Sequence, residues 1–252
     1  MVLQIIKDNT TLHDNYASWG ADHCFIGRVR VKPREEFILS DLEGRGVTLY
    51  PSGLSQQVSR SKVQQARLLA EYMIPHTKVI FDQHDLLHAV NLYAEHSITQ
   101  VVTKDDTKNG GMGIHLWQTV EDVFNQATLS VLPYPFVLQP FLADGRDIRV
   151  LKFADYSENY ERFNPSNFRN NLHCGGEPIA CDLTPEQEEM CAKVMHRCKF
   201  PYGHIDLMVS PDGSTYLAEI NLRGGLRVAK ISAPEYKKML ADIHQDFRQR
   251  IT

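Results

Sequence analysis

The sequence has no long apolar run, no excess of positive charge and few cysteines. No uncharged apolar stretch approaches the ~18 residues of a membrane-spanning helix, so we expect no transmembrane segment and no membrane partner. The formal net charge of −4 argues against nucleic acid as a partner, because nucleic-acid-binding surfaces are basic. The N-terminal sequence MVLQIIKDNT lacks the basic head and cleavage pattern of a signal peptide, so we expect a cytoplasmic protein.

The cysteines and histidines give little support for a zinc site. An odd count of five cysteines in a chain of 252 residues indicates reduced thiols rather than a disulfide framework. The spacing of Cys24, Cys174, Cys181, Cys191 and Cys198 does not match the short paired spacings of zinc ligands. A predicted helix carries two histidines one turn apart, but no third ligand is near them, so a solvated helix face is the better interpretation. These histidines are His84 and His88.

Helices and strands are mixed along the chain without an internal repeat or a low-complexity linker, which is typical of the α+β class. We predict a short N-terminal α/β lobe over residues 1–60, a central lobe over 61–139 and a C-terminal lobe over 140–252. Helices are predicted over 34–46, 61–73, 82–96, 119–130, 184–199 and 233–251, with Ser61, Asp82 and Thr184 as N-caps. Strands are predicted over 25–32, 46–51, 76–81, 97–104, 113–117, 137–142, 146–153, 204–209 and 215–221.

The two last strands form a predicted hairpin that carries acidic side chains. If Ser210 and Thr215 close a four-residue loop, Asp206 lies directly opposite Glu219, and the strand period places Asn221 on the same face. Facing carboxylates destabilise a sheet unless a cation lies between them. We therefore predict a divalent metal site, with an acidic face turned to solvent as the alternative.

Glycines follow the strand that ends at Lys104. Gly110, Gly111 and Gly113 allow successive backbone N–H groups to point into one concavity, which is a way to hold phosphate. The alternative is a plain hairpin turn. No GxxxxGK[ST] pattern occurs, so this is not a Walker P-loop.

Three further stretches of predicted extended backbone contribute candidate site residues. Pro140 interrupts the strand VLQPFL, which suits an open connection between two lobes whose free carbonyl groups read an adenine amino group. Alternation in RDIRVLKF places Asp147 and Arg149 on one face. If FRNNLH is extended, Arg169 shares a face with Asn171 and could bind phosphate or carboxylate; a surface loop is the alternative.

These motifs, in this order, resemble the ATP-grasp superfamily and, within it, the RimK-like α-L-glutamate ligases, over roughly residues 46–229. The resemblance implies an ATP-grasp fold with a nucleotide cleft between two α+β lobes. It also implies an ATP-dependent carboxylate–amine ligase that works through an acyl phosphate, with ATP and two divalent ions, Mg²⁺ or Mn²⁺, as cofactors. The expected substrates are a small-molecule or peptide carboxylate and an amine.

The resemblance also implies a role for each matching residue. Lys62 and Lys104 would contact nucleotide phosphates, with Gly110, Gly111 and Gly113 as the flap. Gln139, the carbonyl of Pro140 and the N–H of Leu142 would read adenine, while Asp147 would bind the ribose and Asn171 would complete the nucleotide site. Arg149 and Arg169 would be the catalytic arginines that neutralise the acyl phosphate, and Asp206, Glu219 and Asn221 would bind the metal ions.

The sequence departs from the family where the substrate is expected. Family members usually have Asn-x-Ser-Pro-Gly after the metal ligands, whereas this chain has Asn221-Leu222-Arg223-Gly224-Gly225, which adds a positive charge. Cys174 stands where an arginine often follows the histidine, His173 is only a weak candidate for a general base, and the N-terminal lobe is short. The alternatives are a small-molecule kinase and a nucleotide-binding regulatory protein without turnover. The amphipathic helix over 233–251 packs either inside the subunit or against a second copy in a homo-oligomer.

Overall fold

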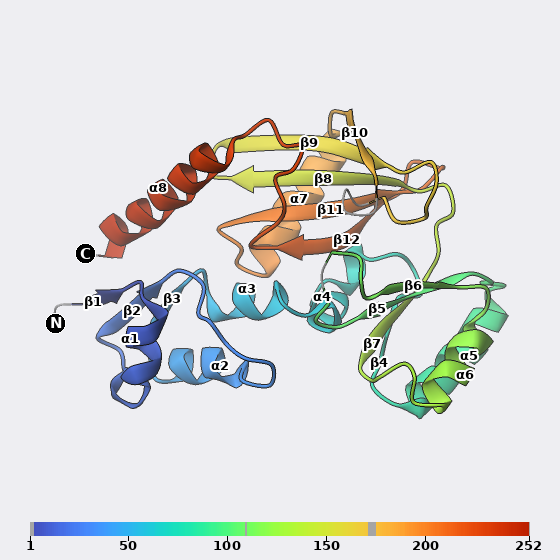
Figure 1. Cartoon of the computed structure of the whole chain (residues 1–252), viewed down its shortest axis with the longest axis horizontal. Coiled ribbons are helices and arrows are strands. Elements are labelled where there is room, and N and C mark those ends of the chain that lie inside the picture. Colours follow the sequence, from blue (N-terminus) through green and yellow to red (C-terminus); the bar gives the residue numbers. More distant parts are fainter. Residues whose placement is uncertain (1–2, 109, 171–174, 252) are drawn as a thin grey trace.

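The computed structural model describes residues 3–108, 110–170 and 175–251, and three β-sheets organise this part of the chain (Figure 1). Each sheet takes its strands from one part of the sequence, so the chain completes one sheet before it begins the next. The mixture of helices with parallel and antiparallel strands confirms the predicted α+β class. Within these ranges, no helix is both long and apolar enough to cross a membrane.

The N-terminal lobe contains a parallel three-stranded sheet with helices in its connections. The predicted strand over 25–32 is wrong beyond Ile26, because Gly27 takes a φ of +135° and turns the chain out of the sheet. A side chain holds the following backbone instead, since the N–H of Val29 donates to Gln56 Oε1 at 2.8 Å. The elements are β1 (Gln4–Ile6), α1 (Asn9–Asp14), η1 (Tyr16–Ser18), β2 (His23–Ile26), α2 (Phe37–Gly44) and β3 (Thr48–Tyr50).

Two short helices lead from this lobe to the central lobe and attach to the C-terminal sheet. Ser61 caps the second of them as predicted, because its Oγ accepts a hydrogen bond from the N–H of Gln64 at 3.0 Å. This helix ends at Leu68, earlier than predicted, and a 3-10 turn follows. The buried Gln65 side chain pairs with both backbone groups of Ile220, at 2.9 and 3.0 Å, and so joins the helix to the last strand. The elements are α3 (Gly53–Val58), α4 (Lys62–Leu68) and η2 (Ala70–Tyr72).

The central lobe is an antiparallel sheet in the order β4-β7-β5-β6, with two helices against one face (Figure 1). Leu86 and Tyr93 of the first helix and Val123 of the second are fully buried with Phe136 of the sheet. Asp82 caps the first helix, as predicted. The elements are β4 (Lys78–Ile80), α5 (Gln83–Glu95), β5 (Val101–Asp105), β6 (Ile114–Trp117), α6 (Val120–Thr128) and β7 (Phe136–Pro140).

The C-terminal lobe is an antiparallel sheet in the order β10-β9-β8-β11-β12, and α7 covers one of its faces (Figure 1). The strands predicted from the sequence do not include β9 and β10. The buried side chains of β9 are Glu158, Tyr160 and Arg162, so polar residues conceal the alternation that identifies a strand. The elements are β8 (Arg146–Phe153), β9 (Tyr156–Phe163), β10 (Glu177–Ala180), α7 (Pro185–Arg197), β11 (Tyr202–Val209), β12 (Thr215–Asn221) and α8 (Ala233–Ile251).

The β11–β12 hairpin places Asp206 opposite Glu219, as predicted, but by a different route. Thr215 pairs with Val209, so the loop is one residue longer than predicted. With that loop alone, the antiparallel register would place Ala218 opposite Asp206. A bulge next to Asp206 shifts the register by one residue and restores the pairing of the two carboxylates.

The last helix, α8, packs within the subunit and reaches the N-terminal lobe. The ring of Phe247 stacks on Tyr50 of β3, with centroids 3.8 Å apart and planes 5° apart. Tyr236 and Ile243 of α8 are buried in the core of the C-terminal lobe. We propose that the three lobes have the boundaries predicted from the sequence, 1–60, 61–139 and 140–252. The strands of each sheet fall inside one of these ranges, apart from Pro140 at the end of β7.

Phe247→Ala should lower the free energy of unfolding by about 1–2 kcal/mol, because it removes an aromatic pair and part of the contact between two lobes. Urea denaturation of the whole chain measures this change. Phe37→Ala is the matched control, since the Phe37 side chain is 64% exposed and its loss should change the free energy by less than about 0.5 kcal/mol. Equal effects of the two substitutions would show that the stacked pair does not join the lobes.

Candidate active site

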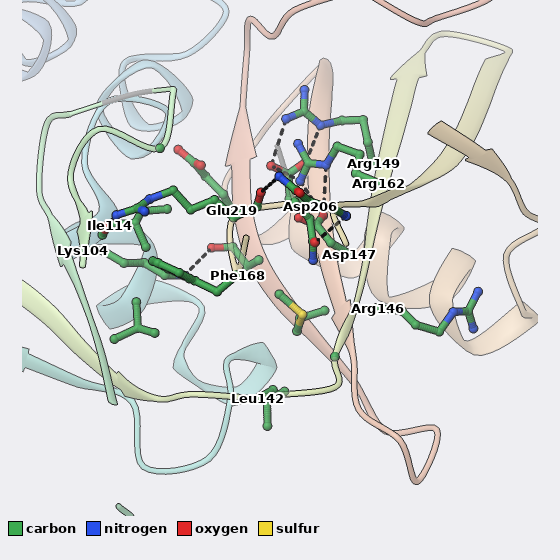
Figure 2. Close-up of a pocket in the computed structure, with 18 of the residues that line it drawn as sticks. Lys104, Ile114, Leu142, Arg146, Asp147, Arg149, Arg162, Phe168, Asp206 and Glu219 are labelled. Carbon is green, nitrogen blue, oxygen red and sulfur yellow. Dashed lines mark hydrogen bonds and ion pairs between the residues drawn. The ribbon is translucent and has the colours of Figure 1, made fainter. Parts of the chain in front are cut away.

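A single cavity of about 780 Å³ collects side chains from all three lobes. Figure 2 shows a cluster of charged residues on the C-terminal sheet, Lys104 and Ile114 on the opposite side, and Glu219 between them. Thirteen of the fifteen residues that the sequence predicts for the site line this cavity. They are Lys62, Lys104, Gly110, Gly111, Gln139, Pro140, Leu142, Asp147, Arg149, Arg169, Asp206, Glu219 and Asn221.

Three charged residues form a row across the C-terminal sheet. Arg149 of β8 lies directly opposite Asp206 of β11, which in turn lies opposite Glu219 of β12. The Arg149 guanidinium binds both carboxylate oxygens of Asp206, and Nη2 lies 3.0 Å from Oδ2. Because residues paired across a sheet project to the same face, all three side chains point into the cavity.

Arg162 of β9 completes this cluster, and the sequence does not predict it as a site residue. Arg162 Nε donates to Asp147 Oδ1 at 3.1 Å, and Nη2 lies 3.2 Å from Asp206 Oδ2. Asp147 therefore pairs with an arginine here, although the resemblance assigns it to the ribose. Glu158, Tyr160 and Arg162 alternate in the sequence, and this alternation predicts the strand β9 if polar side chains are allowed on its buried face.

The arginines control the charge of Asp206. Burial acts to raise the pKa of Asp206, but the guanidinium groups of Arg149 and Arg162 outweigh burial and lower the pKa to about 2. Burial raises the pKa of Asp147, and Arg162 opposes this change. Asp206 is therefore a carboxylate at every pH where the protein would work.

Two lysines face this row from the central lobe and from α4. Lys62 is buried at the start of α4, and its Nζ lies 3.5 Å from Glu219 Oε1. Lys104, near the end of β5, donates to the carbonyl of Ala218 at 3.3 Å. The clamp of Gln65 on β12 explains why Lys62, three residues earlier, reaches Glu219. The two lysines and the row of Arg149, Asp206 and Glu219 thus line opposite walls of one cleft.

Burial lowers the pKa of Lys104 to about 8, although the nearby charge of Glu219 opposes this change. If Lys104 binds phosphate as an ammonium group, the affinity for MgATP should fall by up to about tenfold per pH unit above pH 8. Fluorescence or calorimetric titration between pH 6.5 and 9.5 measures this, and Lys104→Arg should give a flat profile. Lys108→Arg, on an exposed lysine of the same loop, should keep the wild-type profile. Identical profiles for all three proteins would remove Lys104 from phosphate binding.

The glycine-rich segment connects two antiparallel strands and also lines the cavity, so the two interpretations left open by the sequence are compatible. Gly110 and Gly111 have φ values of +69° and +78°, which side chains rarely adopt. Gly113 does not line the cavity. A Cβ at Gly113 would lie 2.7 Å from Lys108 Cβ and 2.8 Å from Asp105 Cβ, so this glycine is needed for close packing at the base of the loop.

The predicted adenine hinge lies at the end of β7. Pro140 follows the last pair of β7 with β4, which joins Leu138 to Lys78, so its missing N–H breaks no bond to β4. Gln139, Pro140 and Leu142 all line the cavity between the central and C-terminal sheets. Their assignment to adenine stays a prediction.

The Arg169 side chain extends from a loop of the C-terminal lobe across the cavity to the central lobe. Its guanidinium stacks over the Phe168 ring, with Cζ 4.2 Å from the centroid, and donates to the carbonyl of Ile114 in β6. Arg169 therefore joins the C-terminal loop to the central sheet beside the glycine-rich segment. The predicted contributions of Asn171 and His173, and the departure at Cys174, lie outside the described residues.

The donor set suits a hard cation such as Mg²⁺ or Mn²⁺. Asp206 and Glu219 offer carboxylate oxygens from paired strands, and Asn221 adds an amide two residues further along β12. Among residues 3–108, 110–170 and 175–251, no group of three or more His, Cys, Asp or Glu side chains could hold a metal ion. His84 and His88 are both exposed on α5. Arginine and lysine side chains neutralise the two carboxylates in this structure.

Comparisons with known proteins agree with this arrangement. The model of the RimK-like ATP-grasp domain matches residues 59–243. The ribosomal protein bS6–L-glutamate ligase of Shigella boydii serotype 4 is 25% identical over 189 residues, which cover 70% of this chain and 61% of that protein. The chain spans less than two thirds of the length of the curated relatives that it matches first.

Solved structures show the same fold. The crystal structure of D-cycloserine synthetase DcsG superposes with a TM-score of 0.61 at 17% identity, covering 88% of this chain and 83% of that one. The ATP-grasp ligase PsnB, complexed with minimal precursor, Mg and ADP, superposes with a TM-score of 0.56 at 18% identity, covering 84% of this chain and 68% of that one. These likenesses confirm the predicted fold, with its cleft between two α+β lobes.

Proposed function

The chain belongs to the RimK-like ATP-grasp family, and from this premise we propose that it is an ATP-dependent carboxylate–amine ligase. A carboxylate does not react with an amine at neutral pH, because its leaving group would be oxide. In the proposed reaction, a substrate carboxylate oxygen attacks the γ-phosphorus of ATP, and the bond from that phosphorus to ADP breaks. The amine then attacks the carbon of the acyl phosphate, inorganic phosphate leaves, and the nitrogen loses a proton as the amide forms.

The observation that carries this proposal is the row of Arg149, Asp206 and Glu219 across the C-terminal sheet. Lys62 faces this row, and its Nζ lies 3.5 Å from Glu219 Oε1. Positive groups on both walls suit a reaction whose transition state carries charge on phosphate oxygens. Lys62 and Lys104 would hold the nucleotide phosphates, with the N–H groups around Gly110 and Gly111 beside them. Arg149 and Arg169 would neutralise the acyl phosphate, and Arg162 would keep Arg149 and Asp206 in place.

Asp206, Glu219 and Asn221 would hold the divalent ions, Mg²⁺ or Mn²⁺, which supply charge neutralisation at the β- and γ-phosphates when bound. Arg149, Arg162 and Lys62 neutralise the carboxylates of Asp206 and Glu219 in this structure. These ion pairs support the proposal, because a divalent cation would take the place of one of these positive partners. Cation-dependent stabilisation against urea, measured with and without nucleotide, tests this assignment independently of activity.

The substrates proposed are a small-molecule or peptide carboxylate and an amine. A relative named as a ligase of L-glutamate to ribosomal protein bS6 and the complex of PsnB with its precursor support this substrate class. Assembly into a homo-oligomer stays a prediction.

The decisive experiment combines ADP release with trapping by hydroxylamine. A screen of amino-acid and small-peptide pairs should show ADP release with at least one pair, and mass spectrometry should identify the amide. Hydroxylamine should intercept the acyl phosphate as a hydroxamate. ADP release with a phosphorylated hydroxyl and no hydroxamate would establish the alternative of a kinase. MgATP binding without ADP release across the panel would establish a regulatory protein.

A further inference from the structure

Two arginines that line the cavity have no carboxylate partner in the described part of the chain. Arg28, from the N-terminal lobe, and Arg223, from the segment after β12, both line the cavity. Among the described residues, neither has an Asp or Glu oxygen within the 4.0 Å of an ion pair. This pattern differs from Arg149 and Arg162, which share Asp206.

Hydrogen bonds hold the backbone at Arg28 and Val29 in a defined place beside the cavity. The Arg28 carbonyl accepts from Asn9 Nδ2 at 3.1 Å, and the N–H of Val29 donates to Gln56 Oε1 at 2.8 Å. Arg60 donates to the Val29 carbonyl at 2.6 Å, so both sides of this segment are fixed. Arg28 Nε is nevertheless buried without a hydrogen-bond partner in the described part of the chain. A buried donor without a partner is costly, and a bound anion would satisfy it.

Contacts of both neighbouring residues hold the backbone at Arg223 in place. Leu222 is fully buried, and its N–H donates to Ser59 Oγ at 2.9 Å. Gly224 lies so close to the cluster that a Cβ there would be 2.5 Å from His204 Nδ1 and 2.8 Å from Arg149 Nη1. The glycine therefore lets this segment lie directly against Arg149, and Arg223 enters the cavity next to the proposed acyl-phosphate site.

The two arginines are close enough to affect one another. Burial lowers the pKa of Arg28, and the positive charge of Arg223 lowers it further. Burial raises the pKa of Tyr236, whereas the charges of Arg223 and Arg28 act to lower it, so its hydroxyl lies near both guanidinium groups. Tyr236 OH lies 3.3 Å from His204 Nε2, which connects this end of the cavity with the Gly224 contact. Repelling cations around a cavity are relieved by an anionic ligand.

This end of the cavity is distinct from the place where the lysines reach β12. Lys104 contacts β12 at Ala218, whereas Arg223 follows its last residue, Asn221. Three residues of extended strand separate these points by roughly 10 Å. Arg223 therefore enters the cavity at a different position along the β12 wall from Lys104.

We propose that Arg28 and Arg223 form a subsite for an anionic group, carboxylate or phosphate, that a substrate carries in addition to the carboxylate that is activated. This inference rests on the proposed ligase function and specifies its substrate class. The N-terminal lobe thereby contributes a specificity residue to a site whose charged cluster comes from the other two lobes.

Calorimetric titration of the whole chain with three probes of matched length tests the subsite, with the nucleotide end saturated by MgADP. Butyrate has one carboxylate, glutarate adds a second, and 4-phosphonobutyrate adds a phosphonate instead. We expect glutarate or 4-phosphonobutyrate to bind at least about tenfold more tightly than butyrate, and the tighter probe distinguishes carboxylate from phosphate. Equal dissociation constants for the three probes would overturn the subsite.

Substitution of each arginine tests whether Arg28 and Arg223 cause the tighter binding of the dianionic probe. Arg28→Gln and Arg223→Gln should each weaken the tighter probe by about 10- to 100-fold and leave butyrate and MgADP unchanged. Arg30→Gln is the matched control, because Arg30 has the same charge and lies on the same segment but is exposed and does not line the cavity. If Arg28→Gln does not fold, Arg223→Gln decides alone, since Arg223 is exposed. A preference that persists in the variants overturns the subsite, whereas failure of MgADP to bind overturns the proposed function itself.

Discussion

Asp206→Asn should lower turnover by at least about 100- to 1000-fold. Asp206 is the centre of the charged row, because it pairs with Arg149 and Arg162 on one side and faces Glu219 on the other. An amide removes the negative charge that the proposed metal site needs, while it keeps the size of the side chain. Steady-state ADP release, with the substrate pair identified by screening, measures the change.

The same substitution should also lower the free energy of unfolding by about 3–5 kcal/mol. It leaves the guanidinium of Arg149 without its carboxylate and takes from the buried Arg162 one of its two carboxylate partners, the other being Asp147. In the folded protein, Arg149 and Arg162 lower the pKa of Asp206 from its ordinary value of 3.8 to about 2. The stabilisation is complete above pH ~4 and is lost as pH falls through about 2. Urea denaturation at pH 7.5 and at pH 3 measures the difference between wild type and variant, which should shrink at the lower pH.

Asp155→Asn is the control for both effects, because Asp155 is exposed in the turn between β8 and β9. It should change neither turnover nor unfolding beyond about 0.5 kcal/mol. If Asp206→Asn unfolds more easily but turns over at the wild-type rate, Asp206 is a partner of the arginines only. The metal site would then have to be assigned elsewhere.

Arg169→Ala should lower kcat by about 100- to 1000-fold, the loss expected when one donor to a developing charge is removed. Arg169 reaches across the cavity to the carbonyl of Ile114, and so its guanidinium lies beside the glycine-rich segment. Lysine at this position should restore little of the rate, because an ammonium group does not replace a planar guanidinium that stacks on Phe168. Single-turnover kinetics with saturating MgATP measure the step directly.

Arg67→Ala is the matched control for Arg169→Ala. Arg67 also lies over a phenylalanine ring, with Cζ 5.5 Å from the centroid of Phe81, but it is exposed and does not line the cavity. It should keep the wild-type kcat. A wild-type rate for Arg169→Ala would leave Arg169 as a link between two walls of the cleft, with no part in the chemistry.

Several elements follow from short stretches of sequence alone. The caps Ser61, Asp82 and Thr184 are where they are predicted, and α8 has the predicted bounds, Ala233–Ile251. A cap needs only a side chain and the N–H groups of the next turn, so the information lies within a few residues. The order of the motifs is likewise a property of the chain, and the family follows from it.

The site itself depends on contacts between distant parts of the chain. Arg162 belongs to the site because β9 pairs with β8 and places it opposite Asp147, whereas its strand carries polar side chains on the buried face and so gives a weak signal in the sequence. The pairing of Asp206 with Glu219 was predicted, yet a bulge rather than the loop length produces it. Arg28 is far from every motif in sequence, and only the docking of the N-terminal lobe brings it into the cavity.

The helix caps, the acidic hairpin and the family follow from the sequence alone, because each depends on neighbouring residues or on their order. Which charges are paired depends on how the three lobes pack together. Arg149 and Arg162 find a carboxylate across the sheet, whereas Arg28 and Arg223 meet each other at the end of the cavity without one. The physical reason is that Coulomb energy depends on distance in space and on burial, and neither quantity can be read from separation along the chain.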